Sequence, residues 1–550
     1  MNIKKAKSTL IESQSFKNNT TLVDENKLYT YLKFDPNKIS GDILKELEKD
    51  STSKILDFPF ANGEIYNDEF SLNQSMAKDL ADGNLYAVVK KNTIAETLLK
   101  GSIVNALQLD ELYLPDESDT TLQFQALREA GYTETQIDAL RACLFKRPNG
   151  FVRYLDQETG NLREVGGMQV WGLVFGIPIH TYTNSVGYYN FPWRFNFGTI
   201  MGTHAKNPRV NIKPFNTQGA WVISLPIQFI IGSVHVQGWV GSCAMRNEVN
   251  FEFREHRQNR YWSQLMDGVN LHDQYATADN IIRSPLGLVM YAHWADNNGN
   301  ASAPMLGHLA GANLPSIALQ YLTNILGLPT SNDLPNIFNL LSGLLPDVTI
   351  RTNGNDERRS YSAILMHTVF HELAHGSHFQ RAGQSYWYDF IRATLRNHPD
   401  DQCGGGYGCG QNADDGNVAI GESWAEFLGT NHALRLHPNG EKESRWAGFT
   451  FTSFWQTAFI TNRNALERER WFFNNWISSG IYNDLMDLAN TDPTEFWDRI
   501  GGLSIQQLYE ALGPNIDFFC NYEWEIINRY GLSTGDVDDI FFNNGAGGCL

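Results

Sequence analysis

The 550-residue chain has few cysteines, no long apolar run and a deficit of positive charge. Six cysteines are too few for a disulfide scaffold, and no pair has the close CxxC spacing of a zinc ribbon. Lysine and arginine number 43 against 61 aspartates and glutamates, and this net charge of −18 argues against general binding to nucleic acid. The most apolar stretch, Gly219–Met245, is broken by proline, glycine, glutamine and histidine, so we expect no transmembrane span.

The overall composition is typical of a folded protein with more than one domain. A hydrophobic fraction of 42 % with 19 % charged residues excludes global disorder, and 14 tryptophans are enough to build large cores. Because a single core rarely grows beyond about 250 to 300 residues, we expect two or three domains.

Neither the beginning of the chain nor its cysteines determine the cellular compartment of the protein. Lys4 and Lys5 look like the charged start of a secretion signal, but Ser8 and Glu12 interrupt the apolar core that should follow. Either the protein is not secreted or the numbered chain lacks its leader. Two disulfides are conceivable, and free thiols are the alternative: Cys403 with Cys409, and Cys520 with Cys549.

The residue composition and hydrophobic pattern change along the chain and suggest three regions. Residues 1–149 have a loose polar start and then a mostly helical pattern, clearest over Thr121–Phe145. Residues 150–255 consist of short aromatic and β-branched runs between glycine, proline and asparagine, which predicts antiparallel strands. Residues 256–550 are mainly helical and carry the strongest motif. We therefore expect an α+β multidomain fold.

One stretch of the β-rich region, Thr181–Phe191, predicts a hairpin whose turn needs a positive φ at Gly187. It resembles the T-x-T-D-x-x-G-x-Y-x-F hairpin of carboxypeptidase-regulatory-like, transthyretin-like domains, with Asn184 where that family usually has Asp. The resemblance implies that residues 150–255 form an antiparallel β-sandwich. Such accessory modules are common in proteins outside the cytoplasm.

The strongest motif is the HExxH sequence from His371 to His375, late in a periodic helical stretch over Tyr361–Phe379. Residues four apart lie one turn apart on the same helix face, so both imidazoles can bind one metal ion. Glu372 follows the first histidine directly, and its carboxylate can take a proton from a metal-activated water. The motif therefore predicts a Zn²⁺ site with Glu372 as general base.

A zinc site of this class needs a third protein ligand. The metzincin pattern would place His at position 381, where this chain has Arg381, so that subclass is excluded. The stretch Val418–Gly429 resembles the ligand helix of thermolysin-like metallopeptidases, in which a Glu ligand is followed four residues later by an acid. The resemblance implies Glu422 as the third ligand. It also implies that Glu426 accepts a hydrogen bond from a ligand imidazole, although the family more often has Asp there.

The interval between His375 and Glu422 is longer than in thermolysin-like enzymes, which argues for a distinct gluzincin-like family. The two motif phrases look like those of poorly characterised bacterial zinc metallopeptidases. The resemblance implies a mainly helical, zincin-like catalytic domain over residues 256–550, preceded by the β-sandwich and an N-terminal helical region. It also implies zinc-dependent hydrolysis of a peptide or protein substrate. The sandwich and the family favour the cell envelope or secretion.

Residues around the motif have less definite roles. His367 and His378 lie on the same helical stripe as the two ligands, and we expect them to surround the ligands or line the cleft. Val348–Ile350 stands where zincins place the edge strand that binds an extended substrate. The group that stabilises the oxyanion is not assigned, and its candidates are Tyr386, Tyr388, Tyr407 and His432.

Two alternative functions stay open. The first is an extracytoplasmic binding or adhesion protein with a structural or vestigial zinc site, which a closed set of four ligands including His378 would favour. The second is a different zinc hydrolase, such as an epoxide or amide hydrolase, because metal and fold do not fix the substrate. The oligomeric state is not predicted.

Overall fold

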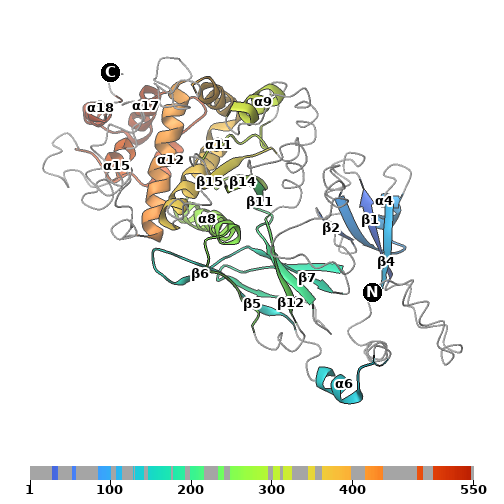
Figure 1. Ribbon diagram of the computed structural model, residues 1–550. Helices are drawn as coiled ribbons and strands as arrows, with labels where there is room; N and C mark the ends of the chain where they lie inside the picture. Colours follow the sequence, from blue (N-terminus) through green and yellow to red (C-terminus); the bar gives the residue numbers. More distant parts are fainter. Residues whose placement is uncertain are drawn as a thin grey trace. The chain divides into compact units, whose positions relative to one another are not determined.

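The computed structural model shows a mixed protein of helices and several antiparallel sheets (Figure 1). The chain divides into two compact units, of which the second comprises Leu155–Asn161, Pro208–Ile212 and His256–Leu550. The structure describes residues 28–34, 53–56, 85–100, 107–113, 128, 131–141, 147–174, 177–191, 199–215, 233–240, 248–294, 301–309, 314–324, 345–352, 362–397, 415–437, 480–486, 499–544 and 546.

The described part of residues 1–149 differs from the mostly helical region that we expected. It contains a four-stranded sheet in the order β2-β3-β1-β4, with antiparallel pairing throughout. Aromatic and β-branched residues dominate β1 and β3, and most of their side chains are buried. The described helices of this region are short. Helix α6 lies within the helical stretch expected over Thr121–Phe145, and most of the rest of that stretch lies outside the described residues. The elements are β1 (Leu28–Phe34), β2 (Ser53–Leu56), β3 (Leu85–Lys90), α4 (Ile94–Lys100), β4 (Leu107–Tyr113) and α6 (Glu134–Arg141).

The described part of residues 150–255 is rich in strands, as expected, and all of these strands except β11 belong to two sheets. One has the order β12-β10-β7-β8 and is antiparallel, and the other joins β13, β5 and β6 with β9 against β5. The pairing of β13 with β5 is parallel, which we did not expect. The strands are β5 (Asn149–Leu155), β6 (Leu162–Glu164), β7 (Gln169–Val174), β8 (Ile177–Tyr182), β9 (Tyr188–Asn190), β10 (Thr199–His204), β11 (Val210–Phe215), β12 (Val234–Val240) and β13 (Phe251–Phe253).

The turn expected at Gly187 is present. Gly187 has a φ of 70°, and the Asn184 side chain accepts backbone hydrogen bonds from Val186 and Tyr188 at 3.1 and 3.0 Å. The strands on either side of this turn do not form a simple hairpin, because β8 pairs with β7 and β9 pairs with β5. The local sequence therefore predicts the turn, whereas the strand partners come from elsewhere in the chain.

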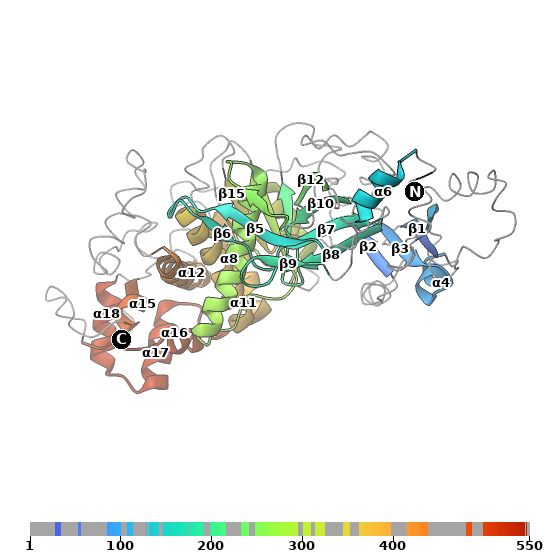
Figure 2. The same ribbon diagram turned by 90° about the horizontal axis from the view of Figure 1, so that it is seen from below.

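The second unit is mainly helical around a three-stranded sheet in the order β11-β14-β15, in which β14 and β15 are parallel (Figure 1). The C-terminal helices gather beside α12 at one end of this unit, as Figure 2 also shows. Its elements are α8 (Gln258–Ala278), β14 (Leu288–Trp294), α9 (Leu314–Asn324), β15 (Val348–Thr352), α11 (Ser362–Asn397), α12 (Asp415–Leu436), α15 (Gly480–Met486), α16 (Ile505–Glu510), α17 (Phe519–Tyr530) and α18 (Thr534–Asn543).

Helix α11 includes the helical stretch predicted around HExxH and continues beyond it. Gly383, with φ 85° and ψ 175°, breaks it into two helical parts. Such a backbone conformation is accessible to glycine and strained for other residues. The second part brings Trp387 and Phe390 back against His375, with ring centroids 5.9 and 5.5 Å away.

Helix α12 lies beside α11 (Figure 1) and is buried on nearly every side. Its other face belongs to a large core formed with the C-terminal helices, in which Trp424 and Phe427 pack on Tyr482. A helix enclosed in this way has little freedom to shift. The position of the α12 side chains that face α11 is therefore fixed by packing on the opposite side.

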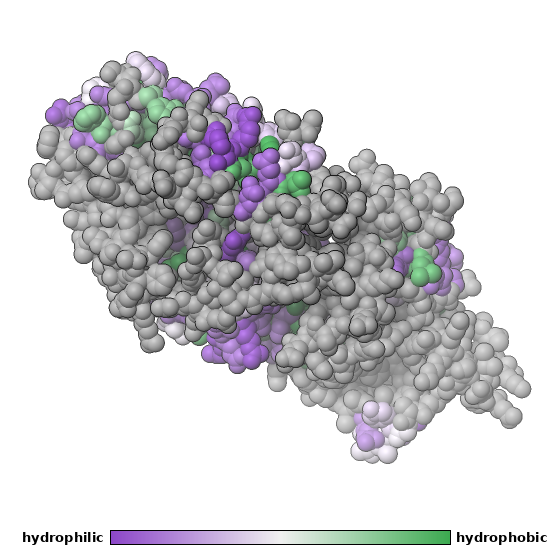
Figure 3. Space-filling view, turned by 45° about the horizontal axis from the view of Figure 1, so that its top comes forward, coloured by the Kyte–Doolittle hydropathy of each residue, from purple (hydrophilic) through white to green (hydrophobic). Residues whose placement is uncertain are grey.

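No described helix has the length and apolar character needed to cross a membrane. On the face drawn in Figure 3, the coloured residues are mostly hydrophilic, and hydrophobic side chains form only small, separate patches.

Candidate metal centre

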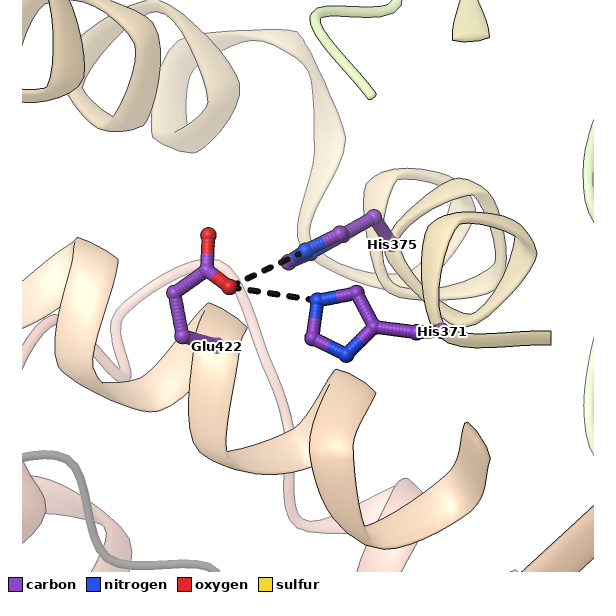
Figure 4. Close-up of side chains that lie close together, drawn as sticks. All are labelled: His371, His375 and Glu422. Carbon is purple, nitrogen blue, oxygen red and sulfur yellow. Dashed lines mark hydrogen bonds and ion pairs between the residues drawn. The ribbon is translucent and has the colours of Figure 1, made fainter. Parts of the chain in front are cut away.

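The three residues expected as ligands lie together where α11 and α12 meet. Glu422 Oε2 is 3.2 Å from His371 Nε2 and 3.5 Å from His375 Nε2. Figure 4 shows the Glu422 carboxylate pointing toward both imidazole rings. The three side chains form a group that can hold a metal ion, with one ligand atom from each residue and all three atoms within 4.8 Å of one another.

The electrostatics of this group fit a bound cation. Burial alone would lower the pKa of His371, but hydrogen bonds to Glu422 and Glu426 hold it well above its ordinary value. Burial alone would raise the pKa of Glu422, but His375 and His371 hold it at about 2. The carboxylate is thus charged and attracts a proton onto His371, and a cation can take the place of that proton. Two imidazole nitrogens and one carboxylate oxygen are a ligand set that zinc accepts.

Glu426 holds the ring of His371 from the other side. Its Oε2 lies 3.2 Å from His371 Nδ1, so the opposite nitrogen, Nε2, faces Glu422. The other oxygen of Glu426 lies 3.6 Å from His367 Nε2, and Thr430 Oγ1 lies 3.4 Å from the same nitrogen. Glu426 therefore contacts His371 at the nitrogen opposite Glu422, and His367 lies next to Glu426.

Glu372 lies beside the ligands but is not one of them. It is 4 % exposed, and within the described part of the chain its Oε2 has no hydrogen-bond partner. Burial raises its pKa to about 8, His371 opposes this rise, and Glu422 adds to it. Glu372 is therefore a buried carboxyl group with an unused oxygen beside the candidate metal site.

His378 is not a fourth member of the group. Its ring is fully buried against Tyr386 and Trp387, with ring centroids 4.9 and 5.7 Å away. Burial, with a contribution from His375, lowers its pKa to about 3, so it stays neutral. Among the described residues the metal group therefore has three protein ligands, the number typical of catalytic zinc.

The candidates for the oxyanion-stabilising group lie in different surroundings. The Tyr386 hydroxyl is engaged, since it donates a hydrogen bond to the Asn417 carbonyl at 2.8 Å. His432 is fully buried and lies 3.2 Å from Asp279, in a separate cluster with His272 and Tyr275. Tyr388 is half-buried on α11. Tyr407 lies outside the described residues.

The cysteine predictions fall mostly outside the described residues. This applies to Cys403, Cys409 and Cys549. Cys520 is disulfide-bonded, and its partner is outside the described part of the chain.

Sequence reasoning missed the glycines that let the two ligand helices approach. A Cβ atom at Gly429 would lie 2.9 Å from the Cα and N atoms of His371, and one at Gly421 would lie 2.6 Å from the Phe390 ring. Gly421 and Gly429 are eight residues apart in α12 and thus on one face. The signal was present, because glycine inside a helix is unfavourable and usually has a packing reason.

A comparison with protein-family models, with curated proteins and with solved structures found no match to this chain. The observations thus define a class of site, a candidate His-His-Glu metal centre between two packed helices, in a mixed α and β protein.

Proposed function

We propose that this protein is a zinc-dependent peptidase of gluzincin-like type, with a carboxypeptidase-regulatory-like module before the catalytic domain. The observation that carries the proposal is the meeting of His371, His375 and Glu422 beside Glu372, whose Oε2 has no hydrogen-bond partner in the described part of the chain. The resemblance of both motif phrases to zinc metallopeptidases supports it further. The same resemblance supports a location in the cell envelope or outside the cell.

Each residue of the site has a distinct role in the proposed reaction. Zinc bound by the three ligands would polarise the substrate carbonyl and lower the pKa of a water molecule. Glu372 takes the proton from the attacking water and later gives it to the leaving amine. Glu426 keeps His371 in the orientation that binds the metal. Trp387 and Phe390 shield His375 from water.

A binding or adhesion protein with a structural zinc site is the weaker alternative. Structural zinc sites are closed by four protein ligands. The group in the described part of the chain has three, and His378 packs among aromatic rings instead. This count favours an open coordination position and hence catalysis.

The test is to measure metal content and digestion of a broad peptide library for wild type and two variants. Glu372→Gln should keep the metal and lower turnover about 10²- to 10⁴-fold, because it cannot accept the proton. Glu422→Gln should lose metal and activity together. Glu525→Gln, a change at a half-buried residue of α17 that pairs with Arg529, is the matched control and should alter neither. Undiminished turnover by Glu372→Gln would contradict the assigned mechanism.

A further inference from the structure

A segment of the chain already occupies the outer edge of β15. Strand β14 lies on one side of β15, in parallel register. On the other side Ser302 forms an antiparallel bridge with Thr349, in which the Thr349 N–H donates to the Ser302 carbonyl at 2.7 Å. The Ser302 N–H returns a hydrogen bond to the Thr349 carbonyl at 3.0 Å. Thus both backbone groups of Thr349 that point away from β14 are bonded.

The same segment also forms main-chain hydrogen bonds with the two residues that precede β15, Pro346 and Asp347. The Met305 N–H donates to the Asp347 carbonyl at 3.0 Å, and the Leu306 N–H donates to the Pro346 carbonyl at 3.1 Å. Met305 and Leu306 are fully buried. We name Ala301–Leu306 the edge segment. Its burial and its main-chain bonds make it a fixed part of the fold.

Tyr321 of α9 fastens the edge segment to β15 through side chains. Its hydroxyl donates to Thr349 Oγ1 at 3.1 Å and lies 2.5 Å from Ser302 Oγ. Tyr321 is 3 % exposed. A buried hydroxyl bonded on both sides gives the Ser302–Thr349 bridge a second attachment that does not depend on the backbone.

The elements that hold the edge segment pack against the helix that carries the proposed catalytic base. Helix α11 packs against both α9 and β15. Burial raises the pKa of Tyr321, and the nearby carboxylate of Glu372 adds to that rise. The residue that fastens Ser302 is therefore within the electrostatic reach of Glu372.

These contacts bear on how a peptide can bind. An extended peptide adds to a sheet edge through outward-facing N–H and C=O groups, which occur at every second residue of a strand. At Thr349 these groups are taken by Ser302. A peptide antiparallel to β15 runs toward Thr349 with its C-terminal end, so its C-terminal residues meet the edge segment.

We propose that Ser302 is a stop that limits how far a peptide pairs with β15, so that the enzyme cleaves near the carboxyl end of a chain. The inference rests on the proposed peptidase function and adds a substrate class to it. Long unfolded segments, which would have to continue past Thr349, are poor substrates.

The test combines an activity-independent measurement with kinetics on the zinc-loaded full chain. Hydrogen exchange of the fragment containing Thr349 should be slow in wild type. Ser302→Pro removes the N–H that bonds Thr349 and should speed this exchange. Ser302→Ala, the matched control, keeps the backbone bridge and loses only the Oγ contact with Tyr321, so the exchange should stay much slower than in Ser302→Pro.

Two peptide series, starting from one cleaved peptide and lengthened at either end, give the kinetic readout. For wild type and Ser302→Ala, lengthening at the C-terminal end should lower kcat/KM about tenfold or more, whereas lengthening at the N-terminal end should not. In Ser302→Pro, lengthening at the C-terminal end should no longer lower kcat/KM; we call this lowering the C-terminal penalty. If that variant does not fold, Tyr321→Phe should reduce both the protection of Thr349 and the penalty.

Rapid exchange at Thr349 in wild type would overturn the inference, because the edge would then be open. Slow exchange at Thr349 together with an unchanged kcat/KM on C-terminal lengthening of the peptide would overturn it too. If the peptide library contains no cleaved peptide from which to start, the peptidase proposal fails and the stop fails with it, while the exchange data still show whether the edge is covered.

Discussion

Three buried or nearly buried carboxylates at the candidate metal centre have different partners, and this difference separates their proposed roles. Glu422 contacts two imidazoles, Glu426 contacts His371 from behind, and Glu372 has an oxygen without a partner in the described part of the chain. The side chains that share a ligand ring act together, so their effects will not be additive.

Glu426→Gln tests the residue behind the ligand. The change keeps the shape of the side chain but removes the charge that favours the Nδ1–H form of His371. We expect zinc affinity to fall about 10- to 100-fold, as for other partners of metal-bound histidines. Competition with a chromophoric chelator measures it, with Glu525→Gln as control. An unchanged affinity would show that Glu426 does not support the ligand.

His308, which is not part of the candidate metal centre, should make a pH-dependent contribution to the stability of the fold. Its Nδ1 lies 2.9 Å from the buried Asp347 and its Nε2 lies 3.0 Å from the Leu286 carbonyl, so both nitrogens face acceptors. Burial alone would lower its pKa, but Asp347 and the carbonyl raise it above its ordinary value. Because the folded pKa is raised, the contribution to stability is full below the unfolded pKa and is lost as pH rises through the folded pKa.

We therefore expect His308→Gln to destabilise the second unit more at about pH 5 than at about pH 9. Thermal unfolding of wild type and variant at both pH values measures the difference. A constant difference across this range would mean that the charge of His308 does not contribute.

At the scale of elements, the site depends on the close approach of α11 and α12. Gly429→Ala would place a methyl group 2.9 Å from the backbone of His371, which cannot move aside as a side chain can. We expect destabilisation by about 1–3 kcal/mol and weaker zinc binding, because α12 must shift away from the ligands. Unfolding and metal titration measure both effects.

Gly535→Ala is the matched control for this prediction. It also lies in a helix, α18, and a Cβ atom there meets nothing within 4 Å. It should be neutral or stabilising by about 0.5–1 kcal/mol, because alanine is the better helix former. Equal effects of the two changes would show that the contact with His371 is unimportant.

The elements also show what the sequence could predict. The HExxH helix was predictable because its periodicity and its ligand spacing are both local. The turn at Gly187 was predictable for the same reason, whereas the partners of β8 and β9 were not, because strand pairing depends on distant residues. The N-terminal sheet was missed since its short strands are widely spaced in the sequence. Glu422 was found only through a resemblance, and the domain boundaries stay a prediction.

At the scale of the whole molecule, the net charge of −18 is not purely a surface property. Glu372 and Glu426 are buried, and Glu422 is nearly so, at the point where two long helices meet. Three carboxylates in such a place repel one another unless positive charge is nearby. The histidines supply part of that charge, and a divalent cation would supply the rest.

Removal of the metal should therefore destabilise the second unit selectively. An ion that binds only the folded state at about 100 times its Kd adds about 2.7 kcal/mol of stability. We expect a chelator to lower the unfolding temperature of this unit and to speed hydrogen exchange in α11 and α12, and added zinc to reverse both. Exchange in the β7–β10 sheet of the first unit is the internal control and should not change. An identical unfolding temperature with and without chelator, in protein shown to contain metal beforehand, would mean that the ion does not join the two helices.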